Sequence, residues 1–132
     1  MSDYGLLNEE FINKHNLDAE NRTRENMNSW FDVIEDKINE TSNDPYDSVK
    51  DMLVEISAFL GEQMRMELGG DWCYGNEKRT VLIKKMNALN KTIGTLGLVI
   101  KSWKDQDVPF LREFYYRVLD SKLPLTSQQK GE

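Results

Sequence analysis

Apolar residues recur every three or four positions along most of the chain, which is the spacing of one buried face of a helix. The pattern around residues 6–12 predicts a short first helix that ends in the polar run 13–16. A second stripe predicts a helix of roughly twenty residues that fades at 41–43. The apolar positions of that stripe are Met27, Trp30, Phe31, Ile34 and Ile38.

A third, longer helix is predicted to start at Asp44-Pro45. Asp accepts a hydrogen bond from a free backbone amide, and Pro fits the first helical position. Gly69-Gly70 predicts its end, because glycine takes the left-handed conformation that helix ends favour. Its apolar face is wide, which predicts that it is the central helix of the domain. The residues of this face are Val49, Met52, Leu53, Ile56, Phe59, Leu60, Met64 and Leu68.

After Asp71 the pattern changes. Residues 72–74 and 80–83 flank the pair Gly75-Asn76, which predicts a β-hairpin. The segment 89–103 keeps helical spacing, but its glycines and β-branched residues suit a strand, so both remain open and the helix is favoured. Asp107-Val108-Pro109 predicts the start of a last helix.

Together these elements predict one α+β domain, residues 1–123, with a flexible tail at 124–132. The domain is predicted to be mainly helical, with four to five helices and a small antiparallel β-hairpin packed on the long central helix. Most aromatic residues of the helical stretches are expected in the core, with Tyr116 the most exposed of them.

The composition fits one small domain: the chain has 132 residues, of which 39% are hydrophobic and 30% charged. Cys73 is the only cysteine, which excludes an internal disulfide and a thiolate-rich metal site. No apolar run is long enough to cross a bilayer, and the first ten residues are acidic where a signal peptide would be basic. We therefore expect a cytoplasmic protein.

Charge is segregated along the sequence. The formal net charge is −6, and residues 32–55, with eight acids against two bases, carry all of it. Residues 78–104 hold seven bases and no acid. An acidic excess repels phosphate backbones, so we expect no nucleic-acid partner. The basic strip 78–104 is expected to face solvent, with self-association against the acidic window of a second copy as the alternative.

Catalytic signatures are scarce. His15 is the only histidine and lies in a polar stretch, so a nucleophile with an adjacent base is not expected. The glycine pairs lack the lysine and the order of elements that a phosphate-binding loop needs. Paired carboxylates on helix faces leave a carboxylate-dependent metal enzyme as an alternative. We predict that the protein is not an enzyme and has no metal or cofactor.

Six acidic residues recur at helical spacing within the acidic window. Like charges four residues apart destabilise a helix by about 0.2–0.5 kcal/mol each, so the stripe has a cost. It is interpreted either as a solvated face or as a docking surface for a cationic partner. The residues predicted to bind that partner are Asp32, Asp36, Glu40, Asp47, Asp51 and Glu55.

The sequence Leu60-Gly61-Glu62, then 68–72 (L-G-G-D-W) and the strand 81–83, resembles a pattern of small bacterial immunity proteins. These domains are encoded beside toxins of contact-dependent and type VI secretion systems. The resemblance covers roughly residues 53–120. It implies a small acidic cytoplasmic protein that binds and neutralises one cognate toxin, and it assigns no binding residue.

The sequence therefore predicts a non-enzymatic inhibitor that binds a cognate toxin or another cationic protein through an acidic surface, with no membrane partner and a possible homodimer. One alternative is a phage-encoded inhibitor of a host defence nuclease. Another, of a different class, is the carboxylate-dependent metal enzyme.

Overall fold

The computed structural model describes residues 4–68, 71–74, 81–84 and 94–121. Five helices make up most of this part: α1 (Tyr4–His15), α2 (Arg24–Glu40), α3 (Tyr46–Leu68), α4 (Thr95–Asp105) and α5 (Val108–Ser121). Two four-residue strands, β1 (Asp71–Tyr74) and β2 (Val81–Lys84), pair antiparallel with Trp72 opposite Ile83.

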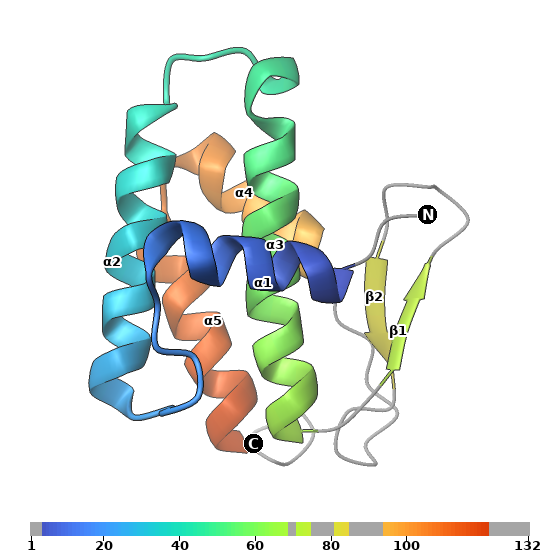
Figure 1. The fold of residues 1–132 in the computed structure, drawn as a ribbon. Coiled ribbons are helices and arrows are strands. Elements are labelled where there is room, and N and C mark those ends of the chain that lie inside the picture. The colour runs from blue at the N-terminus through green and yellow to red at the C-terminus, as the bar shows by residue number, and fades with distance from the viewer. Residues whose placement is uncertain (1–3, 69–70, 75–80, 85–93, 122–132) are drawn as a thin grey trace, which may run out of the picture.

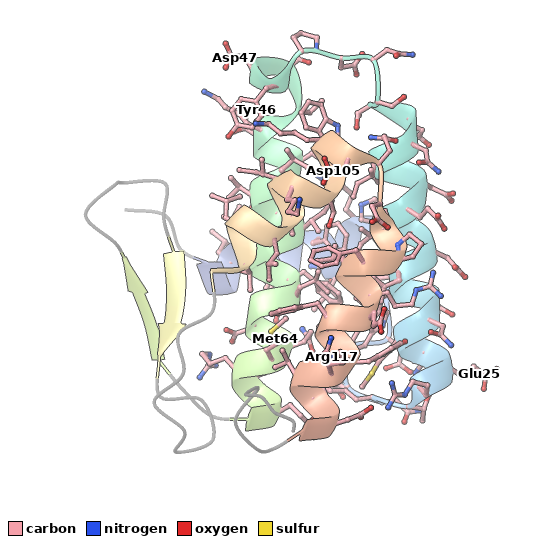
Figure 2. All side chains as sticks on the ribbon, turned by 180° about the vertical axis from the view of Figure 1, so that it is seen from behind. Glu25, Tyr46, Asp47, Met64, Asp105 and Arg117 are labelled. Carbon is pink, nitrogen blue, oxygen red and sulfur yellow. The ribbon has the colours of Figure 1, made fainter. Side chains whose placement is uncertain are left out.

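The helices are stacked in layers (Figure 1). Helices α2 and α3 run antiparallel, joined by the turn 41–45, and α1 crosses one face of this pair. Helices α4 and α5 cover the opposite face, as the view from behind shows (Figure 2). Each helix has an apolar stripe that another helix covers, which is the arrangement that amphipathic helices require.

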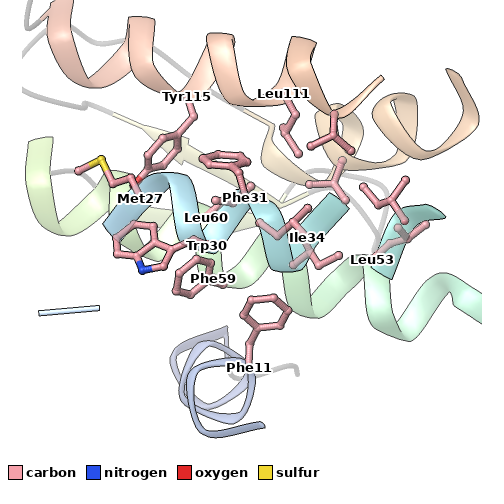
Figure 3. Packing of buried hydrophobic residues seen from close by; sticks show 14 of the residues in the cluster. Phe11, Met27, Trp30, Phe31, Ile34, Leu53, Phe59, Leu60, Leu111 and Tyr115 are labelled. Atoms are coloured by element: carbon pink, nitrogen blue, oxygen red, sulfur yellow. The ribbon is translucent and has the colours of Figure 1, made fainter. Parts of the chain in front are cut away.

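The core lies where these layers meet (Figure 3). Phe59 of α3 packs against Phe11 of α1 and edge-on against Trp30 of α2, with ring centroids 5.1 and 5.2 Å apart. Phe31 meets Tyr115 of α5 in the same way, at 5.3 Å. All five stripe residues predicted for α2 are buried, so this helix and its inward face are confirmed.

A polar chain crosses the buried side of α1. Gln63 of α3 donates from Nε2 to Oδ1 of Asn8 at 3.1 Å, and Arg22 donates from Nε to Oε1 of Gln63, also at 3.1 Å. Asn8 and Gln63 are almost fully buried. Buried amides need such partners, because an unsatisfied one costs about 1–3 kcal/mol. The chain of bonds therefore connects α1, the segment before α2, and α3.

The predicted α+β fold with a hairpin packed on the central helix is wrong, because in the described part of the chain the domain is built from five helices, and the two strands lie beside them. The described strands pair only with each other and lie to the side of the helices, apart from α3 (Figure 1). Local alternation favours an extended backbone, but two strands of four residues are too small to form a layer of the core. The helical stripes instead cover one another.

The predicted helix boundaries and the predicted exposure of aromatic residues agree with the structure only in part. The third helix begins at Tyr46, one residue after the predicted proline, and the disputed segment is helical from Thr95. Tyr116 is half-buried, whereas Phe110 is the exposed aromatic residue of α5, at 38%. The predicted tail at 124–132 lies outside the described residues.

Candidate protein-binding surface

One side of α2 faces solvent along the whole helix and carries acids at helical spacing. Its exposed carboxylates, which we call the acidic stripe, are Glu25, Asp32, Asp36 and Glu40. At a rise of about 1.5 Å per residue the stripe extends over roughly 22 Å. The opposite side of α2 is apolar and buried, so core packing holds the stripe in a fixed orientation.

Ion pairs with neighbouring bases neutralise little of the charge of the acidic stripe. Among the described residues, Glu25 and Asp36 take part in no ion pair. Glu40 lies 3.5 Å from Lys37, with its side chain 63% exposed. An exposed pair of this kind contributes at most about 1 kcal/mol and leaves the carboxylate open to solvent.

A row of polar side chains joins one edge of the stripe to α5, and we call it the α2–α5 seam. Arg24 donates from Nη2 to both carboxylate oxygens of Asp120, at 2.7 and 2.9 Å. One turn along, Tyr116 donates its hydroxyl to Oδ1 of Asn28 at 2.5 Å. The positions 24, 28 and 32 of α2 face 120, 116 and 112 of α5, as expected for antiparallel helices.

The third pair of the seam is looser. Arg112 Nη2 lies 3.9 Å from Asp32 Oδ1, and the Asp32 side chain is 72% exposed. That distance is too long for a hydrogen bond. Asp32 therefore belongs both to the seam and to the exposed stripe.

Asp47 and Asp51 lie on another side of the molecule. Both are exposed on the first turns of α3, and neither is in an ion pair within the described part of the chain. Figure 2 shows Asp47 pointing away from α2, whereas Glu25 points out from the far side of α2. These two acids therefore do not extend the acidic stripe.

Glu55 belongs to the contact between α1 and α3. Lys14 of α1 donates from Nζ to both of its carboxylate oxygens, at 2.9 and 3.2 Å, and only 17% of the Glu55 side chain is exposed. This ion pair joins α1 to α3. It is unavailable to a partner unless α1 moves.

The structure thus does not bring the six predicted residues into one surface. Asp32, Asp36 and Glu40 share the stripe, Asp47 and Asp51 form a separate patch, and Glu55 is part of the fold. Sequence reasoning missed Glu25, which lies seven residues before Asp32 and hence on the same helix face. The window of charge that began at Asp32 excluded it.

His15 and Cys73 lie on different elements, α1 and β1. His15 packs against the ring of Phe11, with centroids 4.6 Å apart. Partial burial lowers its pKa from the ordinary value of 6.5, and the positive charges of Lys37 and Lys14 lower it further, while Glu55 acts in the opposite direction. Cys73 lies in β1, whose side chains the structure does not describe.

Within the described ranges, no three side chains of His, Cys, Asp or Glu come together as a metal site requires. No described helix combines the length and the apolar character needed to cross a bilayer.

No protein-family model matches the chain, and neither a curated protein nor a solved structure does.

Proposed function

We propose that this protein is a non-enzymatic inhibitor that binds a cationic protein through the acidic stripe of α2. The observation that carries the proposal is a row of four exposed carboxylates on one rigid helix face, two of them in no ion pair within the described residues. A negative surface of this kind accelerates encounter with a cationic partner and disfavours acidic competitors.

The cost of the stripe supports a role beyond solubility. Asp36 lies four residues from both Asp32 and Glu40, and each such like-charge pair destabilises a helix by about 0.2–0.5 kcal/mol. Solubility alone is served equally well by acids mixed with lysines. A docking role explains why the acids are concentrated on one face.

The partner that we propose is a bacterial toxin with a basic active-site cleft, neutralised one to one in the cytoplasm. The resemblance of residues 53–120 to immunity proteins of secretion systems supports this choice. An acidic helix can cover such a cleft by occupying the sites that phosphate groups would take. Self-association through the basic strip 78–104 remains a separate prediction, since four of the seven bases of that strip lie outside the described residues.

The proposal is tested with the partner recovered from the source cell by affinity capture and mass spectrometry. Its affinity for the wild type and for the double variant E25Q/D36N is then measured by calorimetry at low and moderate salt. We expect the variant to bind on the order of tenfold or more weakly, with a smaller loss of affinity as salt rises.

The double variant D47N/D51N is the matched control. It also removes one acid from a first helical turn and one from further along the same helix, but on the separate α3 patch. We expect its affinity to stay within about threefold of the wild type. Equal effects of the two variants, or a stronger effect of D47N/D51N, would contradict the assignment to α2.

A further inference from the structure

The α2–α5 seam has two closed pairs and one open pair. Arg24 with Asp120 and Tyr116 with Asn28 are within hydrogen-bond distance, whereas Arg112 is 3.9 Å from Asp32. The Nε atom of Arg112 is buried and has no hydrogen-bond partner among the described residues. A buried donor without an acceptor costs about 1–3 kcal/mol, and more when it is charged. The guanidinium of Arg112 therefore has donors that Asp32 does not use.

The Arg112 side chain is held where it can receive that acceptor. Its guanidinium lies over the ring of Phe31, 5.9 Å from the centroid, and 32% of the side chain is exposed. A guanidinium fixed against an aromatic ring loses little entropy when it binds, because it is already oriented.

Arg112 also lines a hollow on the surface of α5, of about 360 Å³, which we call the α5 hollow. Its lining residues are Pro109, Arg112, Glu113, Tyr116, Arg117 and Asp120. Pro109 and the half-buried Tyr116 ring supply apolar contact. Arg117, labelled on α5 in Figure 2, is exposed and forms no ion pair with the described part of the chain.

The carboxylates near the α5 hollow differ in how strongly they oppose an anion. Asp120 is compensated by the two hydrogen bonds from Arg24. Asp32 and Glu113 are exposed, so water screens their charge. Arg112 and Arg117 together therefore present donors that the neighbouring acids do not saturate.

We propose that the α5 hollow binds a carboxylate carried on an apolar stem. The guanidinium of Arg112 matches a carboxylate with two parallel N–H donors, and Arg117 supplies a second positive charge. Tyr116 and Pro109 cover the stem. The carboxylate comes either from a free small molecule or from an Asp or Glu side chain of a docked protein. Arg112 neighbours Asp32 of the acidic stripe, but this proposal does not depend on the function proposed for the stripe.

The experiment follows the Arg Nε–H resonances of the full chain, labelled with ¹⁵N, during titration with benzoate, acetate and a blocked peptide with a central glutamate. We expect the Arg112 resonance to shift and saturate, with benzoate bound more tightly than acetate because its ring contacts Tyr116 and Pro109. Tighter binding of the peptide than of benzoate identifies a protein chain as the source. The reverse identifies a small molecule, and both outcomes support the site.

Two variants of Arg112 and one control variant decide whether Arg112 is responsible. R112Q should lose saturable binding, followed at the Nε–H resonance of Arg117 in the same hollow, whereas K104Q removes the same charge from an exposed position of α4 and should keep it. R112K keeps the charge without the two parallel donors, so we expect affinity to fall on the order of tenfold, which decides the matter if R112Q fails to fold. A non-saturating Arg112 shift, or an equal loss in K104Q and R112Q, would overturn the proposal.

Discussion

At the scale of single residues, His15 illustrates how a polar side chain becomes part of the packing. It packs against Phe11 at the end of α1, close to three charged groups from three different helices: Lys14, Lys37 and Glu55. Burial and the two lysines disfavour its protonated form, so its pKa is lowered. The neutral imidazole is the form that suits this site.

Acidification is therefore expected to destabilise the protein through His15. Because the folded-state pKa lies below the ordinary value of 6.5, the unfolded chain binds the proton more tightly, and stability falls as pH drops through and below 6.5. Urea unfolding of the wild type and H15Q at pH 7.5 and pH 5.5 measures this. The loss between the two pH values should be smaller in H15Q, and an equal loss would show that His15 does not contribute.

At the scale of elements, α2 carries both the core stripe and the proposed binding stripe, so its ends are important. Thr23 caps its first turn by accepting a hydrogen bond from the amide of Asn26 at 3.1 Å. Replacing Thr23 with Ala leaves that amide without its partner and should cost about 1 kcal/mol. Urea unfolding tests this against S29A, an exposed position of the same helix, for which we expect a change within about 0.5 kcal/mol.

The attachment of α1 to α3 is a second property at this scale. Glu55 holds Lys14, whereas Asp51, one turn earlier on α3, is exposed and in no ion pair among the described residues. We expect E55Q to lower the free energy of unfolding by about 1 kcal/mol and D51N to change it by less than about 0.5 kcal/mol. If both variants match the wild type in urea unfolding, the ion pair makes no net contribution to the attachment of α1.

At the scale of the whole molecule, the placement of acids that suits the proposed binding lowers the stability of the fold. The chain has a net charge of −6, and its acids occupy both favourable and unfavourable helix positions. Asp47 lies in the first turn of α3, where the helix dipole favours a negative charge. Asp36 lies between two other acids on α2, where repulsion opposes it. A carboxylate retained at an unfavourable position is consistent with a functional role.

Two isosteric substitutions should therefore have opposite signs. D36N is expected to stabilise the protein by about 0.4–1 kcal/mol at low salt, because it removes two like-charge contacts. D47N is expected to destabilise it by about 0.3–1 kcal/mol, because it removes a favourable interaction with the helix dipole. Both effects should shrink in 0.5 M NaCl, as screening predicts. A stabilising D47N or a destabilising D36N, measured by urea unfolding, would refute this account.

Apart from the segment 89–103, which stayed open between helix and strand, the sequence by itself determined the helices and their inward faces. The stripe from Met27 to Ile38 repeats with the helical period, and the same periodicity places Asp32, Asp36 and Glu40 on the outside of α2. Burial of the apolar face leaves its polar face in water, so both follow from local spacing. Glu25 could have been found in the same way.

Only the tertiary structure decided which charges are free and which elements form the core. Lys14 and Glu55 are 41 residues apart, and Asp32 and Arg112 are further still, so no local pattern predicts these pairs. The strands followed from the local alternation of the sequence. Which element covers each helical stripe depended instead on how the five helices pack together. Periodicity fixes the direction in which a side chain leaves its own helix, whereas its partner depends on the packing of distant segments.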